Sequence, residues 1–137
     1  MRRTRRLGPV QRAILATEIL AAYVSVRRLL RRHTLPETVA ALRGDPPADT
    51  EATEADRALG RHLAWATVRT ITILPADSRC LMRSLVLTRV MARRGLPSTL
   101  VLSAAPGPQF EAHAWVEYAG EPLLLPAGAS HQQLVRF

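Results

Sequence analysis

The sequence has few of the features that build disulfide frameworks, cysteine-rich zinc sites or membrane spans. Cys80 is the only cysteine, which excludes an intrachain disulfide and a cysteine-rich zinc site, so a cytoplasmic location is expected. The apolar stretch 13–26 follows a charged start, as in a signal peptide. However, Thr17 and Glu18 interrupt it, and it is shorter than the ~20 residues that cross a bilayer. We therefore expect a helix of the mature protein and no stable membrane insertion.

Length and charge predict one domain with a basic N-terminal part. The chain has 137 residues, 47% of them hydrophobic and 22% charged, so a single domain over residues 1–137 is expected. Lysine is absent, and nine of the arginines lie in residues 1–33 against one acid, Glu18, whereas residues 34–137 carry no net charge. The basic helical region 1–49 could contact nucleic acid, an anionic membrane or an acidic peptide, or it could simply be solvated.

Four helices are predicted before any strand. Apolar side chains recur at helical spacing in the first, and the motif Thr34-Leu-Pro-Glu37 is a capping pattern that introduces the second. Asp77 or Ser78 can cap the fourth helix, so that Cys80 lies in its first turn. The expected helices run from Pro9 to about Arg32, from Thr34 to Gly44 with a loop to Thr50, from Thr50–Thr53 to about Ile73, and over roughly Arg79–Arg94.

Short antiparallel strands are predicted after the helices. Strand patterns occupy Thr99–Leu102, Glu111–Tyr118 and Pro122–Leu125, with turns at Ala105–Pro108 and Ala119–Gly120. Helices followed by antiparallel strands are typical of an α+β domain. We expect the small sheet to pack on the fourth helix, which carries the cysteine.

Cys80 is the candidate nucleophile. A thiol attacks only as thiolate, and a helix N-terminus stabilises that anion through its backbone N–H groups and partial positive charge. Arg79 and Arg83 add positive charge that no acid of the same helix offsets. The same N–H groups could bind an oxyanion. The competing interpretation is that a lone helical cysteine is a small buried apolar residue.

His113 is the candidate base because it lies in the middle of the predicted strand 111–118. Strand alternation puts Glu111 and Trp115 on its face, and alanine and valine on the other. If this strand packs beside the start of the fourth helix, thiolate and imidazole can meet at hydrogen-bond distance, as nucleophilic acyl transfer requires. A lone strand histidine is otherwise a satisfied core residue. The other histidines, His33, His62 and His131, have no comparable context.

Three short runs lie at a distinctive spacing: Cys80-Leu-Met-Arg-Ser-Leu85, Arg93-Arg-Gly95-Leu96 and Phe110-Glu-Ala-His-Ala-Trp-Val-Glu117. Together they resemble the protease component of lasso-peptide biosynthesis, a bacterial branch of the transglutaminase-like, papain-related cysteine enzymes. The resemblance covers about residues 50–125. It implies a transglutaminase-like cysteine protease core over residues 50–137.

The resemblance implies a leader peptidase that cuts a ribosomally made precursor. An ATP-dependent lasso cyclase would then join the new N-terminus to an acidic side chain. In such an enzyme Cys80 would be the nucleophile, and His113 would take the thiol proton and later protonate the leaving amine. A small winged-helix protein would recognise the leader, with the N-terminal helices as its docking surface. No cofactor or metal is implied.

The third catalytic residue of that family is missing. The family usually carries an Asp about a dozen residues after the His, on the next strand, but residues 123–126 here are Leu-Leu-Leu-Pro. Glu111 or Glu121 could orient the imidazole, as could a backbone carbonyl or a water. Glu117 lies four strand residues from His113, about 13 Å at ~3.3 Å per residue, which is too far for a direct hydrogen bond. A Cys–His dyad is the preferred interpretation.

Two side chains are candidates for binding substrate, and two other functions stay open. Arg83 could bind a substrate carboxylate or only favour the thiolate, and Trp115 could shield the Cys–His pair or fill the core.

A transglutaminase-like acyl transferase would pass the same thioester to an amine. A basic nucleic-acid-binding module would use residues 1–33 with Cys80 inert, although no aromatic platform or clear helix-turn-helix signature supports nucleic acid as a partner.

Overall fold

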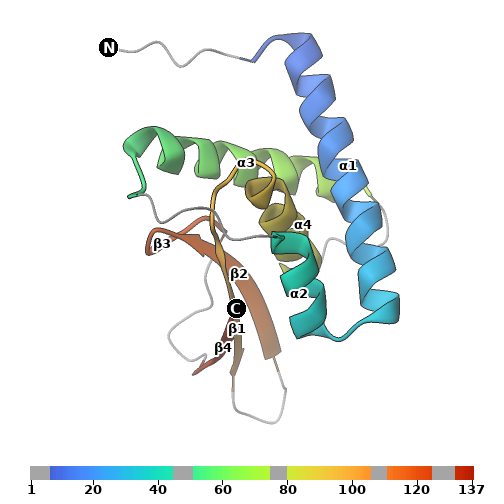
Figure 1. The fold of residues 1–137 in the computed structure, drawn as a ribbon, viewed down its shortest axis with the longest axis vertical. Helices are drawn as coiled ribbons and strands as arrows, with labels where there is room; N and C mark the ends of the chain where they lie inside the picture. The colour runs from blue at the N-terminus through green and yellow to red at the C-terminus, as the bar shows by residue number, and fades with distance from the viewer. Residues whose placement is uncertain (1–6, 45–50, 75–79, 106–110, 125–131) are drawn as a thin grey trace.

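The computed structural model describes residues 7–44, 51–74, 80–105, 111–124 and 132–137, with side chains except at positions 105, 111 and 132–134. Within these ranges the helices precede one antiparallel sheet of strand order β3-β2-β1-β4 (Figure 1). The predicted α+β class is therefore confirmed. The elements are α1 (Pro9–Arg32), α2 (Leu35–Arg43), α3 (Glu54–Thr72), α4 (Cys80–Ala92), β1 (Thr99–Ala105), β2 (Glu111–Tyr118), β3 (Glu121–Pro122) and β4 (Gln132–Arg136).

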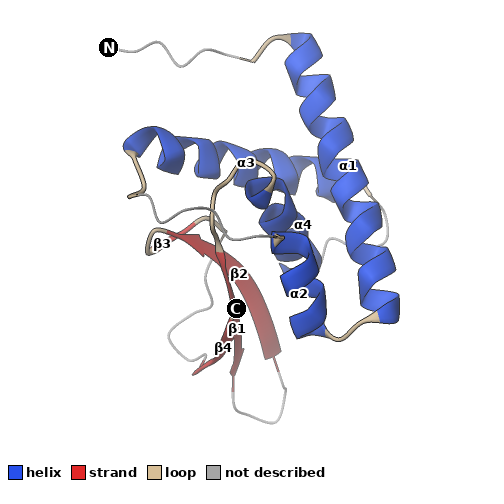
Figure 2. Ribbon diagram, viewed as in Figure 1, coloured by secondary structure: helices blue, strands red, loops and turns tan. Residues whose placement is uncertain are grey.

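The helix that carries the cysteine, α4, is the centre of the fold. It contacts the other three helices on one side and strands β1 and β2 on the other. Figure 2 shows the helices gathered to one side of the sheet. Helix α4 is apolar nearly all round, as expected of a helix enclosed by its neighbours. Its fully buried apolar side chains are Leu85, Val86, Leu87, Val90 and Met91.

The helix starts follow local capping signals. Thr34 and Glu37 form the predicted capping box: the Thr34 N–H donates to Glu37 Oε2 at 2.8 Å, and the Glu37 N–H donates to Thr34 Oγ1 at 3.5 Å. Thr53 and Asp56 do the same for α3. The hydrogen bond from the Thr53 backbone N–H holds the pKa of Asp56 below its ordinary value. Each box satisfies N–H groups that a helix end otherwise leaves unpaired.

The predicted strands differ from the observed ones at their ends. Strand β2 and the turn after it are as predicted, and Ala119 and Gly120 both have positive φ, at 51° and 79°, as a two-residue hairpin turn requires. Strand β1 is longer than expected and includes Ala105, which the sequence pattern places in a turn. The third strand is shorter and ends at Pro122. Strand β4 was not predicted at all, and α4 ends at Ala92 instead of Arg94.

Several predicted features lie outside the described residues. They are the loop 45–50, the helix caps Asp77 and Ser78, the turn residues 106–108, and Leu125.

Partly buried arginines hold the basic N-terminal helices against the rest of the chain. Arg43 of α2 donates to the carbonyl oxygen of Ser98 at 2.6 Å and to that of Phe137, and burial lowers the pKa of Arg43. Arg94, just after α4, makes a bidentate ion pair with Glu18 of α1. Its Nη1 and Nη2 groups donate to Glu18 Oε1 and Oε2 at 2.7 and 2.8 Å. None of the described helices combines the length and the apolar character needed to cross a bilayer.

Candidate active site

Cys80 is the first residue of α4, and its side chain is partly buried against the hydrophobic core. The first N–H groups of an α-helix have no acceptor within the helix. The thiol therefore lies where the backbone of α4 presents donors and the positive end of its dipole. This is the helix-start position that the sequence predicted for the cysteine.

Arg83, one turn after Cys80, links the start of α4 to the end of α3. Its Nη2 group donates to Thr72 Oγ1 at 3.5 Å, and Thr72 in turn donates to the carbonyl oxygen of Val68 at 2.6 Å. The Nε group of Arg83 is buried and has no hydrogen-bond acceptor among the described residues. A buried donor of this kind can still accept a partner that comes from outside the chain.

His113 lies in β2, opposite Ser103 of β1, and its ring stacks on a buried tryptophan. The ring centroids of His113 and Trp115 are 5.9 Å apart, and their planes meet at 27°. Trp115 is only 7% exposed. The indole therefore both fills space on this face of the sheet and limits how the imidazole can turn.

Glu117 extends this arrangement into a row of three side chains, His113, Trp115 and Glu117, on one face of β2. Trp115 Nε1 donates to Glu117 Oε1 at 3.1 Å, and Arg136 of β4 pairs with Glu117 Oε2 at 2.5 Å. Burial alone would raise the pKa of Glu117, but the hydrogen bonds from Arg136 and Trp115 outweigh it and hold the pKa below its ordinary value. The row is thus tied to β4 across the intervening strand.

The structure brings the elements that carry Cys80 and His113 into contact, since α4 packs on β2. The residues between the members of the row, Ala114 and Val116, belong to the core that includes α4. Alternation therefore directs the imidazole of His113 to the face of the sheet that α4 does not cover. Strand β3 pairs only with Glu117 and Tyr118, so the first part of β2 has no outer strand among the described residues.

A family model described as the transglutaminase-like superfamily matches residues 10–135. The chain belongs to the transglutaminase-like superfamily. This superfamily includes cysteine peptidases and acyltransferases. The matched range takes in the N-terminal helices as well as α4 and the sheet. No significant match was found among curated proteins or among solved structures.

The carboxylates that the sequence offered as partners of His113 are engaged elsewhere or lie outside the described side chains. Glu121 pairs with Tyr118, five residues along β2 from His113, and both its oxygens lie 3.2 Å from Arg61 Nη1. The side chain of Glu111 is not among those described. Among the described residues no cluster of three or more His, Cys, Asp or Glu side chains could hold a metal ion.

Sequence reasoning missed the ion pair that anchors the row on β2. The spacing of Trp115 and Glu117 already put both on one face, so the indole–carboxylate contact had a visible signal in the sequence. The partner Arg136 had none, because β4 was not predicted. Register with β1 brings Arg136 opposite Val101, one strand away from Glu117.

Proposed function

We propose that this transglutaminase-like protein is a cysteine peptidase with Cys80 as nucleophile and His113 as general base and acid. The observation that carries the proposal is the position of the only cysteine in the sequence. It is the first residue of the central helix, and that helix packs on the strand bearing His113. Thiol nucleophiles at helix starts, served by a strand histidine, suit acyl transfer.

The proposed reaction follows the balanced steps of acyl transfer. His113 takes the proton of the Cys80 thiol, and Sγ attacks the carbonyl carbon of the scissile peptide bond. The oxyanion receives hydrogen bonds from the free N–H groups of the first turn of α4. The C–N bond then breaks as the imidazolium gives its proton to the leaving amine. Water, deprotonated by His113, hydrolyses the thioester and restores the thiol.

The proposal requires the imidazole to approach the thiol around the outer edge of β2, since His113 projects from the face opposite Ala114. The third catalytic residue would be replaced by the stacked indole of Trp115, which would restrict the ring of His113. Arg83 would use its unpaired Nε group to bind a carboxylate or carbonyl oxygen of the substrate.

We assign the substrate as the leader region of a ribosomally made lasso-peptide precursor. The three runs that begin at Cys80, Arg93 and Phe110 support this assignment through their resemblance to the leader peptidases of that pathway. A small winged-helix protein would present the leader, and a lasso cyclase would use the new N-terminus. A second candidate, acyl transfer to an amine, shares the thioester and is supported by the same superfamily membership.

The test uses a lasso-peptide precursor together with its winged-helix leader-binding protein, with products identified by mass spectrometry. Two fragments indicate a peptidase, and an amine adduct indicates a transferase. We expect the variants Cys80→Ala and His113→Ala to lose activity at least a hundredfold. The matched control is His33→Ala, which changes an exposed histidine at the end of α1. Cleavage by Cys80→Ala protein with an unchanged circular dichroism spectrum would refute the proposal.

A further inference from the structure

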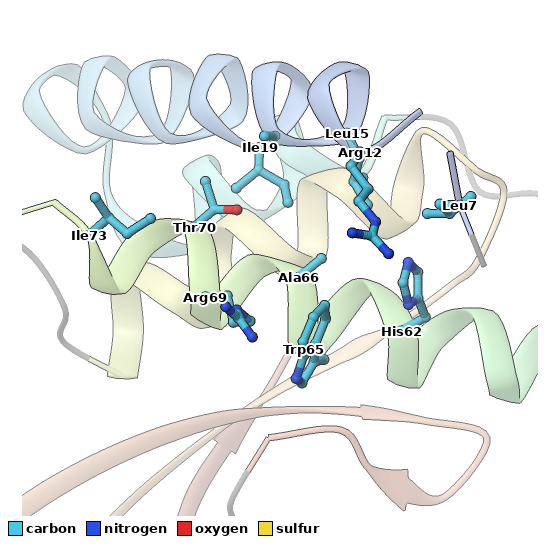
Figure 3. A pocket seen from close by; sticks show the side chains of 11 residues that line it. Leu7, Arg12, Leu15, Ile19, His62, Trp65, Ala66, Arg69, Thr70 and Ile73 are labelled. Carbon is cyan, nitrogen blue, oxygen red and sulfur yellow. The ribbon is translucent and has the colours of Figure 1, made fainter. Parts of the chain in front are cut away.

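A groove between α1 and α3 forms a second candidate site. It encloses a cavity of about 680 Å³, with Leu15 and Ile19 of α1 and Ala66 of α3 as buried apolar lining (Figure 3). Two large apolar side chains stay open to solvent at this groove: Trp65 of α3 is 57% exposed, and Ile73, the residue after α3, is 82% exposed. Clustered apolar surface of this kind marks interaction sites.

The rim of the groove is positively charged. Arg12 of α1 and Arg69 of α3 line it together with His62, and no carboxylate of the described residues does so. Neither arginine forms an ion pair with a described carboxylate. Glu18, the only acid of α1, is already paired with Arg94. Figure 3 shows Arg12 and His62 directed toward one another from the two helices.

The aromatic side chain at the centre of the rim is held in place from both sides. The guanidinium carbon of Arg69 lies 4.9 Å from the centroid of the Trp65 ring, and His62 stacks on the same tryptophan with centroids 6.1 Å apart. Cation–π and stacking contacts lower the entropy that Trp65 would lose on binding a partner. The exposed tryptophan is therefore prepared to act as an anchor for a partner.

We propose that this groove binds an amphipathic helix of a partner protein, with apolar side chains on its floor and carboxylates beside Arg12 and Arg69. From His62 to Ile73, the residue that caps α3, the groove runs along eleven helical rises, or about 16 Å, the length of a three-turn helix. Small-molecule pockets enclose most of their ligand, whereas the exposed walls here leave one side for a helix that brings its own polar face. The proposal does not depend on the peptidase activity.

The probe is a fluorescein-labelled, 14-residue designed helix with leucines on one face and glutamates on the other, and binding is followed by anisotropy. A control peptide carries lysine in place of glutamate. The double variant Arg12→Glu/Arg69→Glu should bind the acidic peptide about tenfold more weakly than wild type, because two rim attractions become repulsions. Arg28→Glu, which reverses one charge at an exposed position of α1 outside the groove, should bind like wild type.

A second variant tests the apolar floor without changing charge. Ala16→Phe places a ring in the groove and should weaken binding at least tenfold while the circular dichroism spectrum is retained. The proposal is overturned if the acidic and basic peptides bind equally, or if Arg28→Glu weakens binding as much as the double variant. It is also overturned if only vesicles of phosphatidylglycerol bind. Cys80→Ala protein should bind the acidic peptide like wild type, so failure here and failure of the peptidase proposal are distinguishable.

Discussion

The carboxylate of Glu117 holds the row of side chains that ends at His113, and removing its charge should weaken the fold by a calculable amount. Glu117 accepts from Trp115 Nε1 at 3.1 Å and pairs with Arg136 at 2.5 Å, with side chains 18% and 47% exposed for Glu117 and Arg136. The variant Glu117→Gln keeps the size and an oxygen acceptor for the indole. It loses an ion pair worth ~0.2–1 kcal/mol and the charge assistance of the indole hydrogen bond, worth about 0.5 kcal/mol.

We therefore expect Glu117→Gln to lower the free energy of unfolding at pH 7 by about 0.7–1.5 kcal/mol. For a chain of this length that is a fall of roughly 2–5 °C in Tm. The measurement is urea unfolding followed by circular dichroism. Glu121→Gln is the matched control, because Glu121 is 40% exposed and its ion pair with Arg61 lies on the surface. Its effect should be smaller.

The stability difference between wild type and Glu117→Gln should depend on pH in a defined direction. The pKa of Glu117 in the fold lies below its ordinary value, so its ionisation stabilises the protein above the unfolded pKa of about 4.3. That contribution is lost as the pH falls through the folded pKa. The gap between wild type and Glu117→Gln should be full at pH 7 and should shrink below about pH 4. Equal stability at pH 7, or a gap that widens on acidification, would refute the reasoning.

Two further substitutions test the stability of α3, one in its interior and one at its N-cap. Gly60→Ala should raise the free energy of unfolding by about 1 kcal/mol, since alanine favours a helix interior and the added Cβ lies 3.4 Å from Leu123 Cδ1 and 3.6 Å from Met91 Cε. A lower Tm would show that the space is closed. Thr53→Ala should cost about 1 kcal/mol through loss of the hydroxyl that accepts from the Asp56 N–H. Unchanged urea unfolding would contradict that capping role.

The parts of the fold that the sequence predicted are those with local causes. Capping boxes at Thr34 and Thr53 set the starts of α2 and α3, and the Ala119–Gly120 turn set the end of β2. These signals act within a few residues of chain. Strand β4 has no comparable signal, because a five-residue strand is fixed by pairing with β1, about thirty residues earlier in the sequence. Long-range pairing of this kind overrides short patterns.

The same division applies to the candidate site. The position of Cys80 at a helix start and the shared face of His113 and Trp115 follow from local periodicity. The anchoring of Glu117 by Arg136 depends on the order of strands in the sheet. The basic groove between α1 and α3 likewise depends on how two helices pack. Periodicity alone specifies neither of these tertiary features.

The central claim is that Cys80 and His113 act as a pair, and alkylation of the only cysteine tests it without any substrate. A free thiol is only about 0.3% ionised at pH 6, whereas a neighbouring imidazolium favours the thiolate. We predict that iodoacetamide modifies wild-type Cys80 at pH 6 at least tenfold faster than it modifies Cys80 in His113→Ala protein, with His33→Ala matching wild type. Equal rates for wild type and His113→Ala, both folded, would show that the imidazole does not serve the thiol.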